Sequence, residues 1–451
     1  MVPDSKKHIA VVGSGAAGMS AAWLLSRSHR VTLLEKDDRI GGHAHTATIP
    51  GELHGGQALG IDTGFIVYNE PSYPNLTRWF EALQVATEDS DMSFAVSRDN
   101  GNFEYAGGPL LGLLAQPGLP LKPRFWRMLL DLLRFYREAP NRIPADGSVT
   151  LGAYLQANRY SQAFIDDHLL PFGAAIWSTP KQQMLDYPAA SFIRFCSNHG
   201  LLQISNRPQW KTVTGGSQSY VRAVADIIGH DAIQTGFAVQ KVERRVDGIT
   251  VHAEDGRTLD ADELVLATHA DQALACLESP SEREVALLSP FRYESNQAYL
   301  HTDISYLPKR RRAWCSWNYV EQSPDDTQQV SLSYWMNRLQ NLRSDTQFVV
   351  TLNPDRVPDD ACVLRSHTYE HPLFNADTWQ AQQALWSLQG QNRTWYCGSY
   401  FGSGFHEDAV QSGLAVAEQL GGLERPWKLE NPSSRIVLSA DADAPARRAA
   451  A

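Results

Sequence analysis

Residues 8–18 read His8-Ile-Ala-Val-Val-Gly13-Ser-Gly15-Ala-Ala-Gly18, and this stretch decides the fold. Its first five residues form a short apolar run, which predicts a buried strand. The Ala- and Leu-rich residues 14–28 predict a helix, and residues 30–34 (RVTLL) predict a second strand. A strand, a glycine-rich turn, a helix and a strand within about 30 residues indicate a βαβ unit with a parallel sheet.

The glycine pattern predicts a dinucleotide site at the turn. A lone GxGxxG is a weak signal because glycines often only make turns, but here the pattern follows a strand and opens a helix. The first glycine makes the tight turn, the second lets the backbone approach a pyrophosphate, and the third lets the helix pack on the strand. The helix N-terminus adds free N–H groups and a positive dipole end. The predicted pyrophosphate site consists of Gly13, Ser14, Gly15, Ala16, Ala17 and Gly18.

Glu35 ends the second strand, 17 residues after Gly18. A carboxylate at this place accepts hydrogen bonds from ribose hydroxyls and disfavours a 2′-phosphate, which argues against NADP. The alternative is a solvated strand end.

The residues after Glu35 separate FAD from NAD. Lys36-Asp-Asp-Arg39-Ile-Gly41-Gly42-His43 resembles the RxGG extension of the amine-oxidase-like flavoproteins, and Ile61-Asp-Thr63-Gly64-Phe65 resembles their next FAD contact. Cys397–Gly413 resembles their closing FAD segment, Val239 their adenine-reading hairpin, and Ala267-Thr268 a strand end that returns to the pyrophosphate. The resemblance implies FAD as cofactor, with further contacts from Lys36, Gly41, Gly42, His43, Thr63, Gly64, Phe65, Ile66, Val239, Ala267, Thr268, Gly398, Ser399, Phe405, His406, Glu407 and Ala409.

Longer motifs resemble one subfamily of these flavoproteins. Gly64-Phe-Ile-Val-Tyr-Asn69, Asn198-His-Gly-Leu-Leu202 and Gly404-Phe-His-Glu-Asp408 are similar to bacterial proteins related to the flavoprotein domain ahead of plant cyclopropane fatty acid synthases. Some relatives resemble methyl-fatty-acid desaturases of furan fatty acid biosynthesis. The resemblance implies desaturation of a fatty acyl chain, methyl-branched or phospholipid-bound, by hydride transfer to flavin N5. It also implies a fatty acyl methyltransferase or cyclopropane synthase as functional partner.

Two alternatives stay open: an amine oxidase or other small-molecule oxidase, and a redox-silent flavoprotein such as an isomerase or a partner of a lipid methyltransferase. Phe405 stands where an amine cage has tyrosine, and residues 291–300 lack the lysine that amine oxidases tend to keep, so both departures weigh against amine oxidation. We predict His406, Phe405 and His199 as catalytic residues, with His301 and Glu407 as further candidate bases. No HExxH motif or carboxylate–histidine cluster predicts a metal site. Only one GxGxxG follows a strand, so electrons are expected to pass to oxygen or another acceptor.

The predicted architecture is α/β, with a Rossmann-type FAD-binding domain of glutathione-reductase or amine-oxidase style and a mixed α+β substrate domain. The FAD domain is discontinuous, from residues 1–75, 205–285 and 385–425, and residues 76–204 and 286–384 form the substrate domain. The Ser-, Ala-, Asp- and Arg-rich tail, residues 429–451, is predicted to be disordered.

Composition narrows the setting. A net charge of −10 argues against nucleic acid, and five widely spaced cysteines without a CxxC pair fit a reducing compartment. The sequence shows no signal peptide and no membrane-spanning apolar run, so we expect a cytoplasmic protein. Peripheral contact at the inner membrane face is expected from the Leu/Pro-rich residues 109–123 and the helix 125–138, with apolar Phe125, Trp126 and Leu129 and cationic Arg124, Arg127, Arg134 and Arg137. The alternative is an ordinary surface helix.

Overall fold

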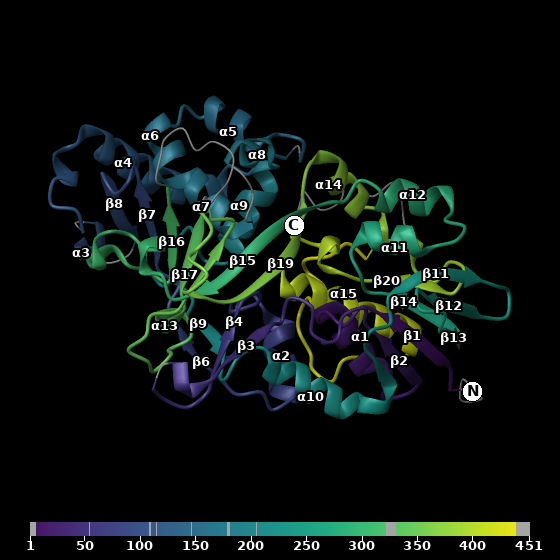
Figure 1. The fold of residues 1–451 in the computed structure, drawn as a ribbon. Coiled ribbons are helices and arrows are strands. Elements are labelled where there is room, and N and C mark those ends of the chain that lie inside the picture. The colour runs from purple at the N-terminus through teal and green to yellow at the C-terminus, as the bar shows by residue number, and fades with distance from the viewer. Residues whose placement is uncertain are drawn as a thin grey trace.

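The computed structural model describes residues 6–438, except residues 54, 108–109, 114, 146, 178–180, 204, 322–330 and 355. Two large sheets organise the chain, and Figure 1 shows the parallel one in the right half of the view and the mixed one in the left half. The parallel sheet takes its strands from residues 8–34, 233–266 and 394–396, and the mixed sheet takes its strands from residues 94–107 and 292–373.

The parallel sheet has five strands, in the order β10 (Ile233–Gln234), β2 (Arg30–Leu34), β1 (His8–Val12), β14 (Glu263–Leu266) and β20 (Thr394–Tyr396). Val11 at the centre pairs with Leu33 on one side and with Val265 on the other. The central strands β1, β2 and β14 are largely apolar and buried, because both faces of such a sheet are covered. The predicted βαβ unit and the α/β class are confirmed.

Two helices pack closely on this sheet. Every residue of α1 (Ala16–Leu25) is buried, and α1 lies against α15 (His406–Gly421). A Cβ at Gly413 would lie 2.3 Å from the Ala17 carbonyl oxygen, so only glycine allows this approach. The close contact fixes the amino end of α15 relative to the glycine-rich turn.

Smaller elements complete this half of the molecule. An antiparallel sheet contains β11 (Val239–Arg244), β12 (Ile249–Ala253) and β13 (Thr258–Ala261). β11 and β12 form the hairpin that begins at Val239, whereas β10 joins the parallel sheet. The helices are α10 (Gln218–Ile228), α11 (Ala270–Cys276), α12 (Glu282–Leu288) and α14 (Ala376–Gln382).

The mixed sheet has seven strands, in the order β19 (Val363–Leu373), β15 (Arg292–His301), β18 (Val349–Leu352), β17 (Leu332–Trp335), β16 (Trp317–Val320), β7 (Phe94–Arg98) and β8 (Phe103–Gly107). The pair β16–β7 is parallel and the other pairs are antiparallel. Two small sheets join the halves: β3 (Thr46–Ile49) with β4 (Leu59–Asp62), and β9 (Trp210–Val213) between β5 (Val67–Asn69) and β6 (Thr87–Ser90).

Helices gather beside the mixed sheet (Figure 1). They have their own apolar core, which includes Phe135, Phe164 and Phe192. These helices are α3 (Leu110–Leu113), α4 (Pro123–Glu138), α5 (Leu151–Ala157), α6 (Gln162–Phe164), α7 (Leu170–Trp177), α8 (Lys181–Asp186) and α9 (Ala189–Asn198), and elsewhere lie α2 (Pro74–Ala82) and α13 (Met336–Leu339). Within the described ranges, no helix combines the length and apolarity needed to cross a bilayer.

The first part of the predicted disordered tail is packed. Ile436 is 1% exposed, and the backbone N–H of Arg435 donates to Gln411 Oε1 at 3.0 Å. The prediction of disorder is therefore wrong over residues 429–438, because side chains there bury against α2 and α15. Residues 439–451 lie outside the described part of the chain.

Candidate functional site

The three glycines of the turn differ in what surrounds them. A Cβ at Gly13, whose φ is +99°, would lie 2.8 Å from the Ala267 carbonyl oxygen, and a Cβ at Gly18 would lie 1.8 Å from the Gly13 carbonyl oxygen. These two glycines are required by backbone packing. Gly15 has an ordinary φ of −67°, and a Cβ there would meet no protein atom within 4 Å. The open space at Gly15, beside the N-terminus of α1, fits a pyrophosphate.

Glu35 ties the end of β2 to this turn. Its buried carboxylate accepts the Ser14 backbone N–H at 3.0 Å and the Ser14 hydroxyl at 2.5 Å through Oε2, and the Asp37 N–H at 3.1 Å through Oε1. A carboxylate offers about four acceptor positions, so Oε1 retains capacity for a ribose hydroxyl.

The glycine pair after β2 lies directly on the turn. Gly41 N–H is 3.1 Å from both the carbonyl oxygen and the hydroxyl of Ser14. A Cβ at Gly42, whose φ is +56°, would lie 3.0 Å from Gly15 Cα. The next residue, His43, has a buried Nε2 without a hydrogen-bond partner in the described structure. A bound polar cofactor would form the missing hydrogen bond with this ring nitrogen, which lies beside the open space at Gly15.

A wall of three side chains on β19, which are His367, Tyr369 and His371, faces this segment. His43 lies 5.0 Å from Tyr369 and 5.3 Å from His371 between ring centroids, and His45 lies 4.8 Å from His367. The Tyr369 hydroxyl is 2.7 Å from Thr63 Oγ1 and 3.1 Å from His45 Nδ1. The sequence analysis missed β19, although the alternation His367-Thr-Tyr369-Glu-His371 is the period of a strand face.

Burial keeps this wall uncharged. Burial lowers the pKa of His45 and of His371 to about 4, and it lowers the pKa of His43 well below the ordinary 6.5. At neutral pH the imidazoles are therefore neutral, each with one donor and one acceptor nitrogen.

The N-terminus of α15 brings two predicted residues together. The His406 ring stacks on Phe65 with centroids 3.8 Å apart, and its Nε2 lies 3.2 Å from the Tyr220 hydroxyl. Burial lowers the pKa of His406 to about 3, so the ring is neutral. Asp408 accepts the Ser403 and Phe405 backbone N–H groups at 3.0 and 2.8 Å, which caps the helix and fixes the preceding loop.

Phe405 points to the other side, into an aromatic cluster. Its ring stacks on Phe195 at 4.3 Å, and Trp177 lies edge-on at 6.2 Å. Trp177 in turn contacts Phe192 and Tyr187 at 5.4 and 4.9 Å. The environment that the helices offer to Phe405 is therefore aromatic and largely apolar.

The structure contradicts the prediction that His199 is a base. Its Nδ1 donates to the Phe195 carbonyl oxygen at 2.8 Å, and its Nε2 accepts from the Arg435 guanidinium at 3.3 Å. Burial and the neighbouring Arg435 hold the pKa of His199 well below its usual value. With both nitrogens occupied, His199 has a structural role.

Glu407 and His301 are also wrong as candidate bases. The Glu407 carboxylate accepts the Asn75 and Leu76 backbone N–H groups at 3.0 and 2.9 Å, so it caps α2 from another element. Only the backbone of Glu407 is left for the cofactor contact predicted for it. His301 is buried, 2.8 Å from Thr351 Oγ1, and its Nδ1 accepts from the Asp303 N–H.

The other predicted contacts follow the same edge of the parallel sheet. Ala267 and Thr268 come directly after β14, and Gly398 and Ser399 come after β20. The carboxyl ends of parallel strands are where ligands of such sheets bind. Lys36 follows the end of β2, Ile66 is buried ahead of β5, Val239 begins β11, and Ala409 lies in the first turn of α15.

Arg435 is a residue that the sequence analysis missed. Its guanidinium bonds the Ser72 carbonyl oxygen and lies 3.5 Å from Asp408 Oδ1. It thereby holds the cap of α15 and His199 at once. No local signal marks it, because the surrounding tail resembles disordered sequence.

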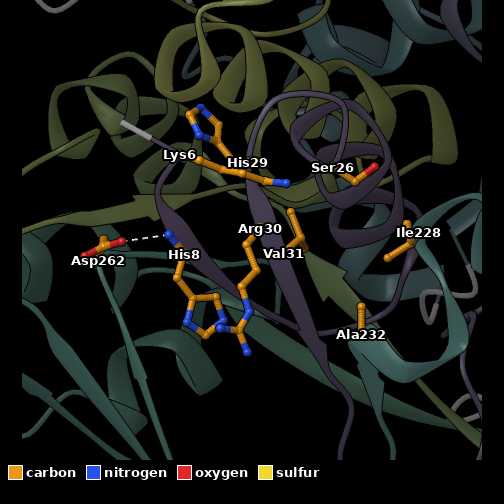
Figure 2. A pocket seen from close by; sticks show the side chains of 9 residues that line it. All are labelled: Lys6, His8, Ser26, His29, Arg30, Val31, Ile228, Ala232 and Asp262. Carbon is orange, nitrogen blue, oxygen red and sulfur yellow. Dashed lines mark hydrogen bonds between the residues drawn. The ribbon is translucent and has the colours of Figure 1, made fainter. Parts of the chain in front are cut away.

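A hollow of about 530 Å³ lies at the opposite edge of the parallel sheet, where β1 and β2 begin. Figure 2 shows the side chains that line it. His8 and Arg30 are the first residues of these strands, and the His8 backbone N–H donates to Asp262 at 2.7 Å. Because this is the amino edge, the hollow is separate from the predicted cofactor site. Its lining consists of Lys6, His8, Ser26, His29, Arg30, Val31, Ile228, Ala232 and Asp262.

Comparisons with known proteins agree with this geometry. A sequence model described as flavin containing amine oxidoreductase matches residues 16–298, which is more than half of the chain. An L-amino-acid oxidase from Siganus canaliculatus is 25% identical over 318 residues, covering 66% of this chain and 57% of that protein. A putative flavin-containing monoamine oxidase, AofH, from Mycobacterium tuberculosis is 25% identical over 271 residues, covering 56% of this chain and 55% of that protein. The chain thus spans little more than half the length of these relatives.

Solved structures share the fold. A CLA-producing fatty acid isomerase from P. acnes superposes with a TM-score of 0.64 at 16% identity, covering 92% of this chain and 98% of that one. Cyclohexylamine oxidase from Brevibacterium oxydans IH-35A gives a TM-score of 0.65 at 17% identity, covering 92% and 99%. At such identities the likeness concerns the fold alone.

Proposed function

The chain belongs to the flavin-containing amine oxidoreductases and is an FAD-dependent oxidoreductase, and from this premise we propose that it desaturates a fatty acyl chain. The acyl chain is methyl-branched or held in a phospholipid. A fatty acyl methyltransferase or cyclopropane synthase would supply such a substrate, and we propose one as the functional partner.

The observation that carries this proposal is the environment of Phe405. A substrate ammonium is recognised over an open aromatic face or by a carboxylate. One face of Phe405 is covered by Phe195 at 4.3 Å, and the nearby carboxylates of Glu407 and Asp408 already cap helices. An apolar, aromatic neighbourhood suits a hydrocarbon chain better than a cation. The fold does not decide between the candidates, because a fatty acid isomerase and a cyclohexylamine oxidase both share it.

Amine or amino-acid oxidation is the second candidate. It is favoured by the names of the relatives, an L-amino-acid oxidase and a putative monoamine oxidase. It is weakened by Phe405 in place of a cage tyrosine and by the lack of lysine in residues 291–300.

His406 remains as the candidate proton acceptor because of its open ring nitrogen, although burial holds its pKa at about 3, far below the range of an efficient general base. When bound, FAD accepts a hydride from a substrate C–H bond, and desaturation also requires removal of a proton. His406 is neutral, and its Nδ1 takes part in no hydrogen bond with the described residues. Tyr220 holds Nε2 and Phe65 holds the ring plane, so these two residues orient His406.

We expect the His406→Ala variant to retain FAD and to lose anaerobic flavin reduction by substrate. Loss of a general base lowers the rate about 100-fold or more. The measurement is the rate of flavin bleaching in stopped flow, with flavin content determined from the absorbance spectrum. Tyr220→Phe tests the orienting hydrogen bond, because it removes only the hydroxyl on His406 Nε2, and it should lower the rate less than His406→Ala does. Unchanged reduction in His406→Ala would remove this residue from the mechanism.

The proposed function is tested by mixing the yellow protein anaerobically with detergent-dispersed phospholipids. Their acyl chains are unsaturated, cyclopropane-containing or methyl-branched, and parallel samples receive amines and amino acids. Bleaching of the flavin by one lipid class and not by amines supports acyl desaturation. Bleaching by amines or amino acids alone establishes the second candidate. If no compound bleaches the flavin, the acyl desaturase proposal is rejected in favour of a redox-silent role.

A further inference from the structure

Helix α4 carries an exposed apolar row. Trp126 is 48% exposed, Leu130 66% and Leu133 39%, at the i, i+4, i+7 spacing of one helix face. Leu121, just before the helix, is 85% exposed. These four residues lie within 13 positions, whereas the other exposed large apolar side chains of the described chain are scattered over it. A contiguous apolar surface of this kind indicates an interaction site.

The structure changes which residues belong to this surface. Phe125, predicted to face a membrane, is 1% exposed and packs in the core, and Leu129 is half-buried. Arg124 binds Asp167 at 2.6 Å and Arg134 binds Asp131 at 2.9 Å, so these two arginines are engaged by the protein. The prediction is therefore wrong for Phe125, whereas Arg124 and Arg134, with side chains 50% and 31% exposed, are paired with carboxylates and are left out of the surface.

Other cations surround the row. Arg127 is exposed beside Trp126, and Arg137, with a side chain 77% exposed, continues the row after Leu133. Lys122 is exposed next to Leu121. The acidic side chains of α4 are already paired with arginines: Glu138 binds Arg137 and Arg142, and Asp131 binds Arg134.

A second basic segment meets the amino end of α4. Lys309, Arg311 and Arg312 are exposed. Arg310 NH1 donates to the Gly101 carbonyl oxygen at 2.7 Å, and Lys122 Nζ donates to the neighbouring Asn102 carbonyl oxygen at 2.8 Å. The turn between β7 and β8 thus brings residues 309–312 beside Leu121 and Lys122. Figure 1 shows α4 and β8 at the end of the molecule away from the parallel sheet.

We propose that this end of the molecule docks on an anionic phospholipid bilayer. The docking surface, here named the α4 surface, consists of Leu121, Trp126, Leu130 and Leu133 with Lys122, Arg127, Arg137, Lys309, Arg311 and Arg312. An amphipathic helix with an apolar row and a cationic rim lies in the headgroup region with its apolar side chains inserted, and tryptophan favours that depth.

Charge explains why the occupant is a bilayer and why binding is oriented. In a two-fold dimer the same surface meets itself, so the cations of the rim would face one another. An anionic bilayer instead complements them. The chain as a whole carries −10, so its other faces are repelled by the same membrane. The docking goes beyond the proposed acyl chemistry and needs no flavin reaction.

The test is co-sedimentation of the FAD-loaded protein with vesicles of phosphatidylglycerol and phosphatidylcholine, against vesicles of phosphatidylcholine alone. We expect binding to the anionic vesicles that weakens with salt. The triple variant Trp126→Ser, Leu130→Ser, Leu133→Ser should bind at least about tenfold more weakly, because the inserted apolar groups are lost. The charge variant Lys309→Gln, Arg311→Gln, Arg312→Gln should lose most of the preference for phosphatidylglycerol.

The matched control is Ile227→Ser, Val246→Ser, Val357→Ser, which removes three exposed apolar side chains elsewhere (51%, 96% and 55% exposed). It should bind as the wild type does. Unchanged flavin content in every variant shows that the fold is kept. Absence of binding to anionic vesicles, or equal binding by the α4 triple variant, overturns the proposal. The proposal is also overturned if the wild-type protein is a dimer in solution and the α4 triple variant is a monomer. Flavin bleaching by detergent-dispersed lipid is unaffected by these variants, so failure of docking and failure of the acyl chemistry are read separately.

Discussion

The Gly15→Val variant is expected to fold normally and to be purified without flavin. Gly15 has an ordinary φ of −67°, so a side chain causes no backbone strain there. An added Cβ meets no protein atom within 4 Å, so the new atoms enter only the space beside the N-terminus of α1. That space is the place of the pyrophosphate, and the affinity for FAD should fall at least about 100-fold, or about 2.7 kcal/mol.

Reconstitution of the apoprotein with FAD, followed by fluorescence quenching, measures this effect. Far-ultraviolet circular dichroism and the thermal midpoint of the apoprotein show whether the fold survives. Gly15→Ala, which adds a single methyl group, should bind FAD with intermediate affinity. Gly18→Val is the contrasting variant, because its Cβ would lie 1.8 Å from the Gly13 carbonyl oxygen and the folded protein should be lost. A folded Gly15→Val protein with full flavin content would rule out the assigned role of the turn.

The cofactor edge could be predicted because its signals are local. Residues 8–18 contain a strand, a tight turn and a helix start within one short stretch, and each feature restricts the neighbouring backbone. The glycine pair at 41–42 was placed by resemblance, and the contact of Gly42 with Gly15 Cα explains why glycine stands there.

The catalytic candidates could not be sorted from the sequence, because their partners are distant in the chain. His199 is occupied by Arg435, and Glu407 is occupied by the first turn of α2. A histidine or a carboxylate in a motif looks the same whether its polar atoms are free or already bonded. Of the candidate bases, only His406 keeps a ring nitrogen that the described residues leave open.

The amino-acid composition of the tail gave a wrong prediction, because a few packed side chains are enough to order this segment. The tail after residue 429 resembles disordered sequence, yet Arg435 and Ile436 bury themselves beside Asp408 and Gln411. On α4 the sequence predicted an apolar and basic pattern, but it did not predict which apolar side chains face the core and which face solvent. Phe125 turned inward and Leu130 outward, because the packing of Met128 and Phe135 selects the buried face.

The stability of the protein is expected to fall steeply as the pH drops below about 6. His168, His199 and His301 are buried and hydrogen-bonded as neutral rings. Burial lowers the pKa of His168 to about 3 and that of His301 to about 4, and the pKa of His199 also lies well below 6.5. The unfolded chain binds protons at these histidines below its ordinary pKa of 6.5, whereas the folded chain does not. These three groups alone remove about 4 kcal/mol of stability for each further pH unit, and the neutral rings of His43, His45, His371 and His406 act in the same direction.

Buried carboxyl groups whose pKa is raised act in the opposite direction, among them Asp62, Glu407 and Asp408. Burial raises the pKa of Asp62 to about 6, so between about pH 4 and 6 the folded state holds a proton that the unfolded state releases. This group alone would stabilise the fold as the pH falls, and it offsets about a third of the histidine effect. The three hydrogen-bonded histidines and Asp62 together remove about 3 kcal/mol per pH unit, so by their effect alone the lower end of the 5–15 kcal/mol typical of a folded domain is exhausted only below about pH 5.

Guanidinium unfolding of the FAD-loaded protein at about pH 7.5, 6 and 5 measures this slope, which sets the pH range in which folded protein persists. His168→Gln keeps hydrogen-bonding atoms for Tyr105 and Tyr136 but does not titrate, so it should flatten the slope by about 1.4 kcal/mol per pH unit. His230→Gln is the control, because the His230 side chain is 75% exposed and paired only with the exposed Asp226. Equal unfolding midpoints at all three pH values, or the same slope in His168→Gln, would show that the buried histidines take up protons without unfolding. Acid sensitivity would then have to come from the carboxyl groups.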